Sequence, residues 1–143
     1  MGFLSGMDIS ASGLNAQRLR MDVISENIAN IDTTRTEDGT PYTRKYVVLE
    51  ERESNFSDVL KGKAEEVRGG VRVAEIGLDT TDYKLVYDPT HPDANEEGYV
   101  QMPNVDLSQE IVNMISAYRS YEANVTAFNA YKNMAVKSLE IGT

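Results

Sequence analysis

Cysteine and tryptophan are absent from this sequence of 143 residues, and histidine occurs only once. The lack of cysteine rules out a disulfide framework and thiolate metal sites, and it leaves the redox compartment open. Basic residues are also scarce, because 14 lysines and arginines stand against 23 aspartates and glutamates, a net charge of -9. Nucleic acids and anionic membrane surfaces are bound by clustered cationic side chains, so this acidic excess disfavours both as partners.

A long apolar run is missing too. No stretch approaches the ~20 apolar residues that a membrane helix requires, so no membrane insertion is expected. The first residues have neither the basic region nor the apolar core of a secretory signal, so no cleaved signal peptide is expected. What the sequence does have is 41% hydrophobic residues, enough at this length for one domain of ordinary size.

Residues 1–31 carry apolar side chains at helical spacing. From Leu4 to Ile31 they recur at intervals of three, four or seven residues, which predicts a long helix. This stripe consists of Leu4, Met7, Ala11, Leu14, Met21, Ile24, Ile28 and Ile31. A second file, made of Ile9, Ala16, Leu19 and Val23, widens the apolar face beyond what one partner would cover. The helix is therefore expected to have more than one neighbour.

A second long helix is predicted over residues 106–143. Its apolar residues follow a heptad with alternating steps of four and three, which is typical of a coiled-coil seam. The seam consists of Leu107, Ile111, Met114, Tyr118, Tyr121, Val125, Phe128, Ala135 and Leu139. Asp106, with Gln109 three residues on, resembles a capping box and places the start of the helix. Rods of such length, at about 1.5 Å per residue, must project or pair.

The middle of the chain, residues 32–105, is predicted to be a small β-rich module. Segments rich in Val, Ile and Tyr predict strands, and the turns between them carry Gly and Pro. The predicted strands are Tyr42 to Glu50, Val71 to Ile76, Tyr83 to Tyr87 and Tyr99 to Met102. The stretch from Arg52 to Glu66 fits either a charged loop or a short helix. The fold class expected is α+β, with the terminal helices pairing as a coiled coil.

The negative charge is concentrated in this middle segment. Residues 1–31 hold three acids and two bases, and residues 107–143 hold three of each, so the middle accounts for eight of the nine net charges. Solvated surfaces carry charge and buried interfaces shed it. The two ends are therefore predicted to form an assembly interface, made of the apolar residues of the first stripe and of the heptad from Ile111 onward.

Signals for chemistry are weak. The lone His91 lies in a turn-like run without a paired nucleophile or ligand set, so a turn role is favoured over catalysis. Asp93 to Gly98 matches the start of a calcium loop, but position twelve is Asn104 rather than a bidentate Glu, which favours a polar turn. Adjacent carboxylate pairs such as Glu96 and Glu97 fit a solubilising role. No catalytic, cofactor or metal site is predicted.

Two segments at opposite ends resemble the signatures of the flagellar axial proteins, the family of rod, hook and hook-associated subunits. Ser25 to Thr34 (SENIANIDTT) resembles the N-terminal signature, and Met114 to Asn124 (MISAYRSYEAN) resembles the second one. The residues that carry the match are Asn27, Ala29, Asn30, Thr33, Tyr121, Glu122, Ala123 and Asn124. Met7 to Leu14 and Lys84 to Ala94, together with the short middle, are similar to the proximal rod subunits of this family. Glu26 departs from the family pattern, in which Asn is common at this place.

The resemblance implies a structural, non-enzymatic role. It implies export by the flagellar type III apparatus without a cleaved signal, and assembly in the periplasm with copies of itself and with other proximal and distal rod subunits. It also implies that the terminal helices line the tube as a coiled coil, with the β module outside. Because one small subunit offers the apolar stripes little partner surface, the ends are expected to become ordered together on assembly.

Asn27 and Asn30 lie three residues apart near the end of the first helix. We expect their amides to cap the helix exit or a neighbour's backbone, with an ordinary Asn-rich helix terminus as the alternative.

Two other functional classes also remain open. A soluble coiled-coil adaptor or chaperone would use the same heptads, and a small enzyme would need a convergent polar site around Asp88, His91 and Asp93.

Overall fold

The computed structural model describes residues 3–52 and 69–141. Two long helices flank four short strands: α1 (Phe3–Ala29), β1 (Lys45–Glu51), β2 (Val71–Leu78), β3 (Lys84–Tyr87), β4 (Tyr99–Met102) and α3 (Leu107–Ile141). The α+β class and all four predicted strands are confirmed, with shifts of up to three residues at their ends. The stretch predicted as a loop or short helix lies outside the described residues, apart from Arg52.

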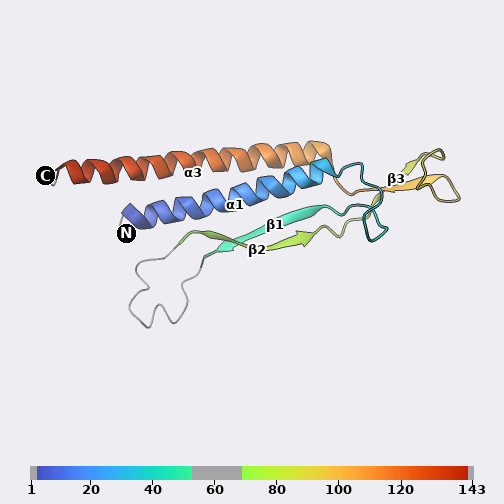
Figure 1. Ribbon diagram of the computed structural model, residues 1–143, viewed down its shortest axis with the longest axis horizontal. Helices are drawn as coiled ribbons and strands as arrows, with labels where there is room; N and C mark the ends of the chain where they lie inside the picture. Colours follow the sequence, from blue (N-terminus) through green and yellow to red (C-terminus); the bar gives the residue numbers. More distant parts are fainter. Residues whose placement is uncertain (1–2, 53–68, 142–143) are drawn as a thin grey trace, which may run out of the picture.

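The molecule is elongated, with α1 and α3 side by side and both chain termini at the same end (Figure 1). The strands form two separate antiparallel pairs, β1 with β2 and β3 with β4. The β1–β2 hairpin runs along α1, whereas β3 and β4 lie at the end opposite the termini (Figure 1). The β1–β2 hairpin belongs to the predicted outer module (32–105), yet it packs directly on α1. The division between this module and a tube-lining domain (1–31 and 106–143) therefore stays a prediction.

Both helix ends near the strands are capped by side chains. Asp106 Oδ1 accepts a hydrogen bond from the backbone N–H of Gln109 at 3.0 Å, which confirms the predicted start of α3. This hydrogen bond, with help from the nearby Lys84 charge, lowers the pKa of the Asp106 carboxyl. At the exit of α1, Asn30 Nδ2 donates to the carbonyl of Glu26 at 2.9 Å, and the same carbonyl also accepts the backbone N–H of Asn30 at 3.1 Å.

The register between the antiparallel helices is set by unusual pairs at heptad spacing. A Cβ placed on Gly6 would lie 2.5 Å from the ring of Tyr131, and one on Gly13 would lie 2.8 Å from Asn124 Oδ1. Further along, Asn27 contacts Glu110. From one pair to the next, the residue number in α1 rises by seven and then by fourteen. The residue number in α3 falls by the same amounts. A side chain at either glycine would displace the α3 side chain that approaches the α1 backbone there, so glycine is favoured at both positions.

Helix α1 has the two neighbours that its wide apolar face predicts. It packs against α3 on one side and against β1 and β2 on another. Ala16, Val23 and Ile24 are buried between these elements. The face that stays exposed is mostly polar and includes Asp8, Asn15, Arg18 and Asp22. Within the described residues α1 thus has most of its apolar surface covered, while α3 packs along α1 alone.

We predict that Gly13→Leu destabilises the chain by about 1–3 kcal/mol, because its side chain would be forced against Asn124 in a filled seam. Urea unfolding followed by circular dichroism measures the change. Ala123→Leu is the matched control, since Ala123 is exposed on α3 and its replacement is expected to change stability by less than about 0.5 kcal/mol. Equal effects of the two substitutions would contradict this account of the seam.

Candidate assembly interface

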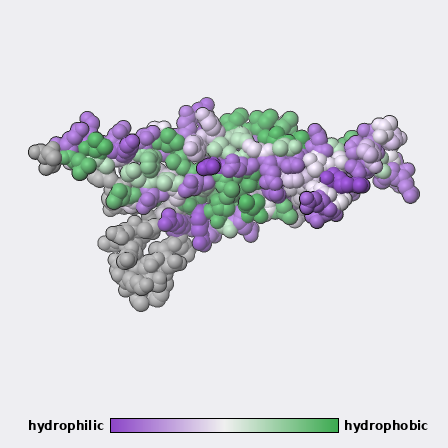
Figure 2. Space-filling view, viewed as in Figure 1, coloured by the Kyte–Doolittle hydropathy of each residue, from purple (hydrophilic) through white to green (hydrophobic). Residues whose placement is uncertain are grey.

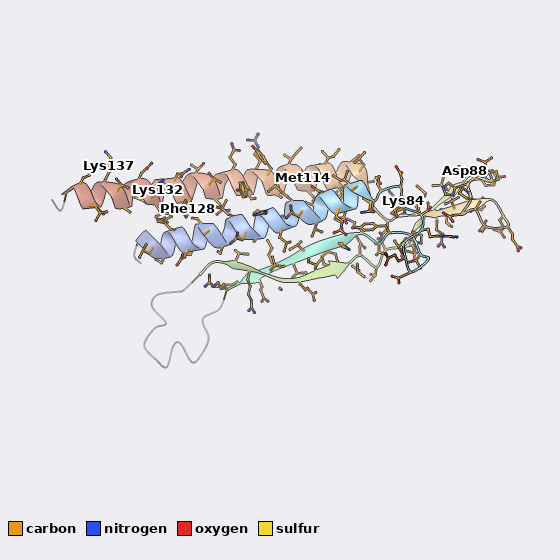
Figure 3. The ribbon with its side chains drawn as sticks, in the orientation of Figure 1. Lys84, Asp88, Met114, Phe128, Lys132 and Lys137 are labelled. Atoms are coloured by element: carbon orange, nitrogen blue, oxygen red, sulfur yellow. The ribbon has the colours of Figure 1, made fainter. Side chains whose placement is uncertain are left out.

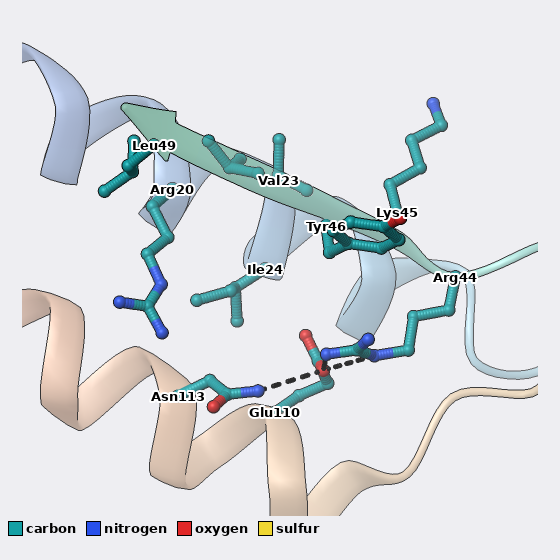
Figure 4. A pocket seen from close by; sticks show the side chains of 10 residues that line it. Arg20, Val23, Ile24, Arg44, Lys45, Tyr46, Leu49, Glu110 and Asn113 are labelled. Atoms are coloured by element: carbon teal, nitrogen blue, oxygen red, sulfur yellow. Dashed lines mark hydrogen bonds and ion pairs between the residues drawn. The ribbon is translucent and has the colours of Figure 1, made fainter. Parts of the chain in front are cut away.

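A buried polar cluster joins the two helices to the strands at the centre of the molecule. It consists of Asn27, Tyr42, Arg44, Asn104 and Glu110. The carboxylate of Glu110 is fully buried, with 0% of the residue exposed. Arg44 donates to Glu110 Oε1 from Nε at 2.8 Å and pairs with it through Nη2 at 2.8 Å, as Figure 4 shows. A carboxylate in this position is tolerable because its charge is matched and hydrogen-bonded.

The Asn27 amide uses its full hydrogen-bonding capacity inside this cluster. Its Nδ2 donates to the Lys45 carbonyl at 2.8 Å and to Glu110 Oε2 at 3.0 Å. Its Oδ1 accepts from the Lys45 N–H and from the Tyr42 hydroxyl, both at 2.9 Å. Two donors and two acceptor positions are all that an amide offers. Asn27 therefore links α1 to β1 and α3 at once, and these partners belong to the same chain.

Asn104 extends the cluster toward the β3–β4 hairpin. Its Oδ1 accepts from the Arg44 backbone N–H at 2.8 Å, and its Nδ2 donates to the carbonyls of Asp79 and Thr81, both at 3.0 Å. Arg44 also pairs with Asp79 at 3.2 Å. Hydrogen bonds from Thr81, and then the Arg44 charge, lower the pKa of the Asp79 carboxyl. The segment that leads into β3 is thus fixed relative to the helices.

Of the residues in this cluster, only Asn27 is predicted from the sequence. The four that are not predicted are Tyr42, Arg44, Asn104 and Glu110. Glu110 lies four residues before Met114 and seven before Ala117, so its position repeats along the α1-facing side of α3. The sequence signal for Glu110 is therefore a carboxylate at a position that faces α1. The apolar Ile111, one residue on, fits the predicted heptad and obscures this signal.

The predicted interface residues of α1 are mostly covered within the subunit. Ile24 is buried, and Leu4 is 78% exposed. The other members are half-buried: Met7, Ala11, Leu14, Met21, Ile28 and Ile31. Most of this stripe therefore already contributes to the fold of the single chain.

The predicted interface residues of α3 divide into two sets. Five lie half-buried along the side of the helix that faces α1: Met114, Tyr121, Val125, Phe128 and Ala135. Met114 and Phe128 are labelled on this side in Figure 3. The others, Ile111, Tyr118 and Leu139, are exposed, as is Leu107. The heptad read from the sequence thus straddles a covered flank and an open flank of one helix.

The open flank carries a row of exposed apolar side chains, which we call the α3 ridge: Leu107, Ile111, Ile115 and Tyr118. Leu107 and Ile111 are 46% exposed, Tyr118 55% and Ile115 56%. Steps of four, four and three residues place them on one face of α3. Figure 2 shows apolar surface over this half of the helix. Ile115 was not among the predicted interface residues, since it falls outside the heptad.

The family-motif residues lie at both the seam and the surface. Asn27 and Asn124 face the opposite helix, and Asn30 accepts a hydrogen bond from the Thr33 hydroxyl at 3.2 Å. Ala29, Glu122 and Ala123 are exposed, while Tyr121 is half-buried. Glu122 pairs with Arg119 on the surface at 3.2 Å. Of the two amides expected to cap, Asn30 adds a second hydrogen bond to the Glu26 carbonyl at the helix exit, and Asn27 binds the backbone of β1.

The segments around His91 and from Asp93 to Gly98, which the sequence offers as candidate catalytic or calcium sites, form hydrogen-bonded turns. His91 Nδ1 accepts from the Asp93 N–H at 3.1 Å, and Asn95 Oδ1 accepts from the N–H groups of Glu97 and Tyr99. Within residues 3–52 and 69–141, no three His, Cys, Asp or Glu side chains gather in a way that could hold a metal ion. Over the same residues, neither helix is apolar enough at membrane-spanning length to cross a bilayer.

We predict that Glu110→Gln costs about 3 kcal/mol of stability, because it leaves the Arg44 charge without its buried counterion and opposes an amide to the Asn27 amide. Chemical denaturation of the purified chain gives this value. Glu122→Gln, which breaks an exposed ion pair, is expected to cost less than about 0.5 kcal/mol. A Glu110→Gln chain as stable as the parent would show that the buried charge pair contributes nothing net.

The stability of the chain is also expected to fall in alkali. Burial, reinforced by the charges of Glu26 and Glu110, raises the pKa of Tyr42 from 10.0 to about 12. The unfolded chain releases this proton at lower pH than the folded chain does, so the contribution is intact below pH 10 and is lost between about pH 10 and 12. Tyr42→Phe should flatten the stability profile in that window, whereas Tyr118→Phe, at an exposed position, should leave its slope unchanged.

Comparison with known proteins adds two family models and several relatives. Residues 7–35 match the model described as "Flagella basal body rod protein", and residues 96–141 match "Flagellar basal body rod FlgEFG protein C-terminal". The flagellar basal-body rod protein FlgC of Bacillus subtilis is 52% identical over 95% of both chains. The FlgC proteins of Borreliella burgdorferi and Salmonella typhimurium are 45% and 42% identical, over 98–99% and 99% of each chain. The chain therefore belongs to the FlgC family of flagellar basal-body rod proteins.

Proposed function

We propose that the chain is a structural subunit of the flagellar basal-body rod that polymerises through its terminal helices and has no enzymatic activity. The observation that carries this proposal is the α3 ridge, a row of large apolar side chains about half exposed on an ordered helix. Exposed apolar surface in a continuous row indicates a partner. The covered side of α3 already holds α1, so the ridge is available to a neighbouring subunit.

The energetics favour burial of the ridge between subunits. Full burial of a large apolar side chain contributes about 1.5–3 kcal/mol, and these four start from roughly half exposure, so each would add on the order of 1 kcal/mol on assembly. One such contact is weak by itself because association also costs entropy. Repetition along a polymer makes many weak contacts act together, and the single subunit stays soluble before assembly.

Within the rod, we place the chain in the proximal part. There it would join copies of itself and other proximal and distal rod subunits. Similarity to FlgC proteins over nearly the full length supports this position. Rod subunits in the periplasm would transmit motor torque to the distal rod and the hook. Export by the flagellar type III apparatus without a cleaved signal is part of the same proposal. The tube would be lined by residues 1–31 and 106–143, with 32–105 outside.

A soluble coiled-coil adaptor is the main rival, and the mode of association discriminates the two. An adaptor would form a closed oligomer of fixed size, whereas a rod subunit would associate without closure as its concentration rises. Sedimentation velocity over a concentration series distinguishes these outcomes. A discrete dimer that persists on dilution would support the adaptor and count against the rod proposal.

We predict that Ile115→Asp abolishes swimming when it replaces the parent chain in the source bacterium. The charge would sit at the centre of the ridge, where it would have to be desolvated on assembly. Because Ile115 is exposed, the purified variant should unfold at nearly the same urea concentration as the parent. Motility on soft agar and the recovery of intact basal bodies are the measurements.

Ile115→Met is the matched control, since it keeps an apolar side chain of similar volume, and it should support swimming. If Ile115→Asp swims as well as the parent, the ridge is not an assembly surface. If deletion of the whole gene leaves swimming intact, the proposed role in the rod is itself wrong.

A further inference from the structure

A cleft lies beside the buried polar cluster, with β1 and α3 as its walls and α1 as its floor (Figure 4). Its volume is about 320 Å³. The lining is apolar along its length and is formed by Val23, Ile24, Tyr46, Val47 and Leu49. One end is closed by Arg44 and Glu110, and Arg20 and Asn113 also border the cleft. This is the kind of surface that accepts a row of apolar side chains.

One cation in this cleft, Arg20, has no partner among the residues that the structure describes. Arg44 pairs with Glu110 and Asp79, and Lys45 pairs with Glu26. Arg20, in contrast, forms no hydrogen bond or ion pair with any other described residue, and its guanidinium points into the cleft (Figure 4). In a chain with a net charge of -9, an unpaired half-buried arginine selects for a carboxylate on whatever occupies the space.

The α3 ridge and the cleft occupy different flanks of the same helix. Asn113, which borders the cleft, lies two residues from both Ile111 and Ile115, and two residues correspond to about 200° of rotation around a helix. One subunit therefore cannot place its own ridge in its own cleft. It can, however, offer its ridge to one neighbour while its cleft receives the ridge of another.

We infer that the cleft of one subunit holds the α3 ridge of a second copy, with Arg20 bound to Glu122 of that second copy. The dimensions agree: Leu107 to Tyr118 spans about 16 Å of helix, and Arg44 to Leu49 spans about 16 Å of strand. Glu122 lies four residues, about one helical turn, beyond Tyr118. With Leu107 at the Arg44 end and Tyr118 at the Leu49 end, the second copy runs parallel to the first.

This pairing rests on the proposed function and deepens it, since it names the two surfaces that meet. It is a head-to-tail contact between unlike patches. Such a contact repeats without limit unless the rotation happens to close a ring, in contrast to a two-fold dimer in which one patch meets itself. Parallel copies joined in this way give an assembly in which every subunit points in the same direction.

Disulfide trapping tests the pairing cleanly, because the chain has no cysteine of its own. Full-length Leu49→Cys is mixed with full-length Tyr118→Cys and oxidised at concentrations where sedimentation shows association. A crosslinked pair of two different chains is expected, since a disulfide needs Cα atoms within about 7 Å. Leu49→Cys mixed with Leu107→Cys is the matched control, and it should crosslink at least tenfold less because Leu107 lies at the other end of the cleft.

Charge reversal gives an independent readout. Arg20→Glu and Glu122→Arg are each expected to weaken association about tenfold, and the two together to restore it, as for a close interfacial charge pair. Glu122 also pairs with Arg119 in its own chain. Arg119→Ala removes that surface pair alone, so it should leave association unchanged and shows which partner of Glu122 matters.

Crosslinking of Leu49 to Tyr118 with restoration by the double reversal would establish the pairing. Association without this crosslink, preferential crosslinking to Leu107, or a double variant as weak as either single one would overturn it and leave the rod proposal standing. Absence of association at every accessible concentration would overturn self-assembly, and the pairing with it.

Discussion

The structure depends on one buried carboxylate, that of Glu110. It lies between the two helices with no exposure to water, and it is held by Arg44 from the strand side and by Asn27 from α1. An unpaired charge in such a place would be prohibitively costly, so the three side chains must meet in a single arrangement. That requirement selects one register for the antiparallel helices and one approach of β1 to both. The glycine pairs further along the seam then fit only in this register.

In this arrangement, the two helices differ in how much of their apolar surface is covered. Helix α1 is enclosed by α3 and by the β1–β2 hairpin, and the part left open is mostly polar. Helix α3 packs against α1 on one side, and none of the described strands forms a second layer on its other side. Its apolar residues therefore divide between a covered flank and the α3 ridge. The same helix stabilises the fold on one flank and presents exposed apolar side chains on the other, which suits the polymerisation that we propose.

The sequence was sufficient for much of the fold. Helical periodicity predicted both helices, Asp106 marked the start of α3, and clusters of Val, Ile and Tyr predicted the four strands. The two neighbours of α1 followed from its second apolar file. What periodicity could not resolve was the rotation of α3 about its axis. The seam includes the polar or small residues Glu110, Ala117 and Asn124 beside larger apolar ones, while the residues of the α3 ridge face outward. A rule that places the most apolar positions inside fails on a helix that keeps large apolar side chains exposed in the single chain.

Helix α3 also extends further along the molecule than α1 does. Gly6 of α1 lies opposite Tyr131 of α3, so the end of α3 around Leu139 extends past the first turn of α1 by roughly 10 Å at 1.5 Å per residue. Leu139 is accordingly 73% exposed. At the opposite end the molecule finishes in the β3–β4 hairpin (Figure 1). An assembly of parallel subunits would thus have chemically distinct ends, one formed by the exposed ends of helices and the other by strands. New subunits would therefore add differently at the two ends.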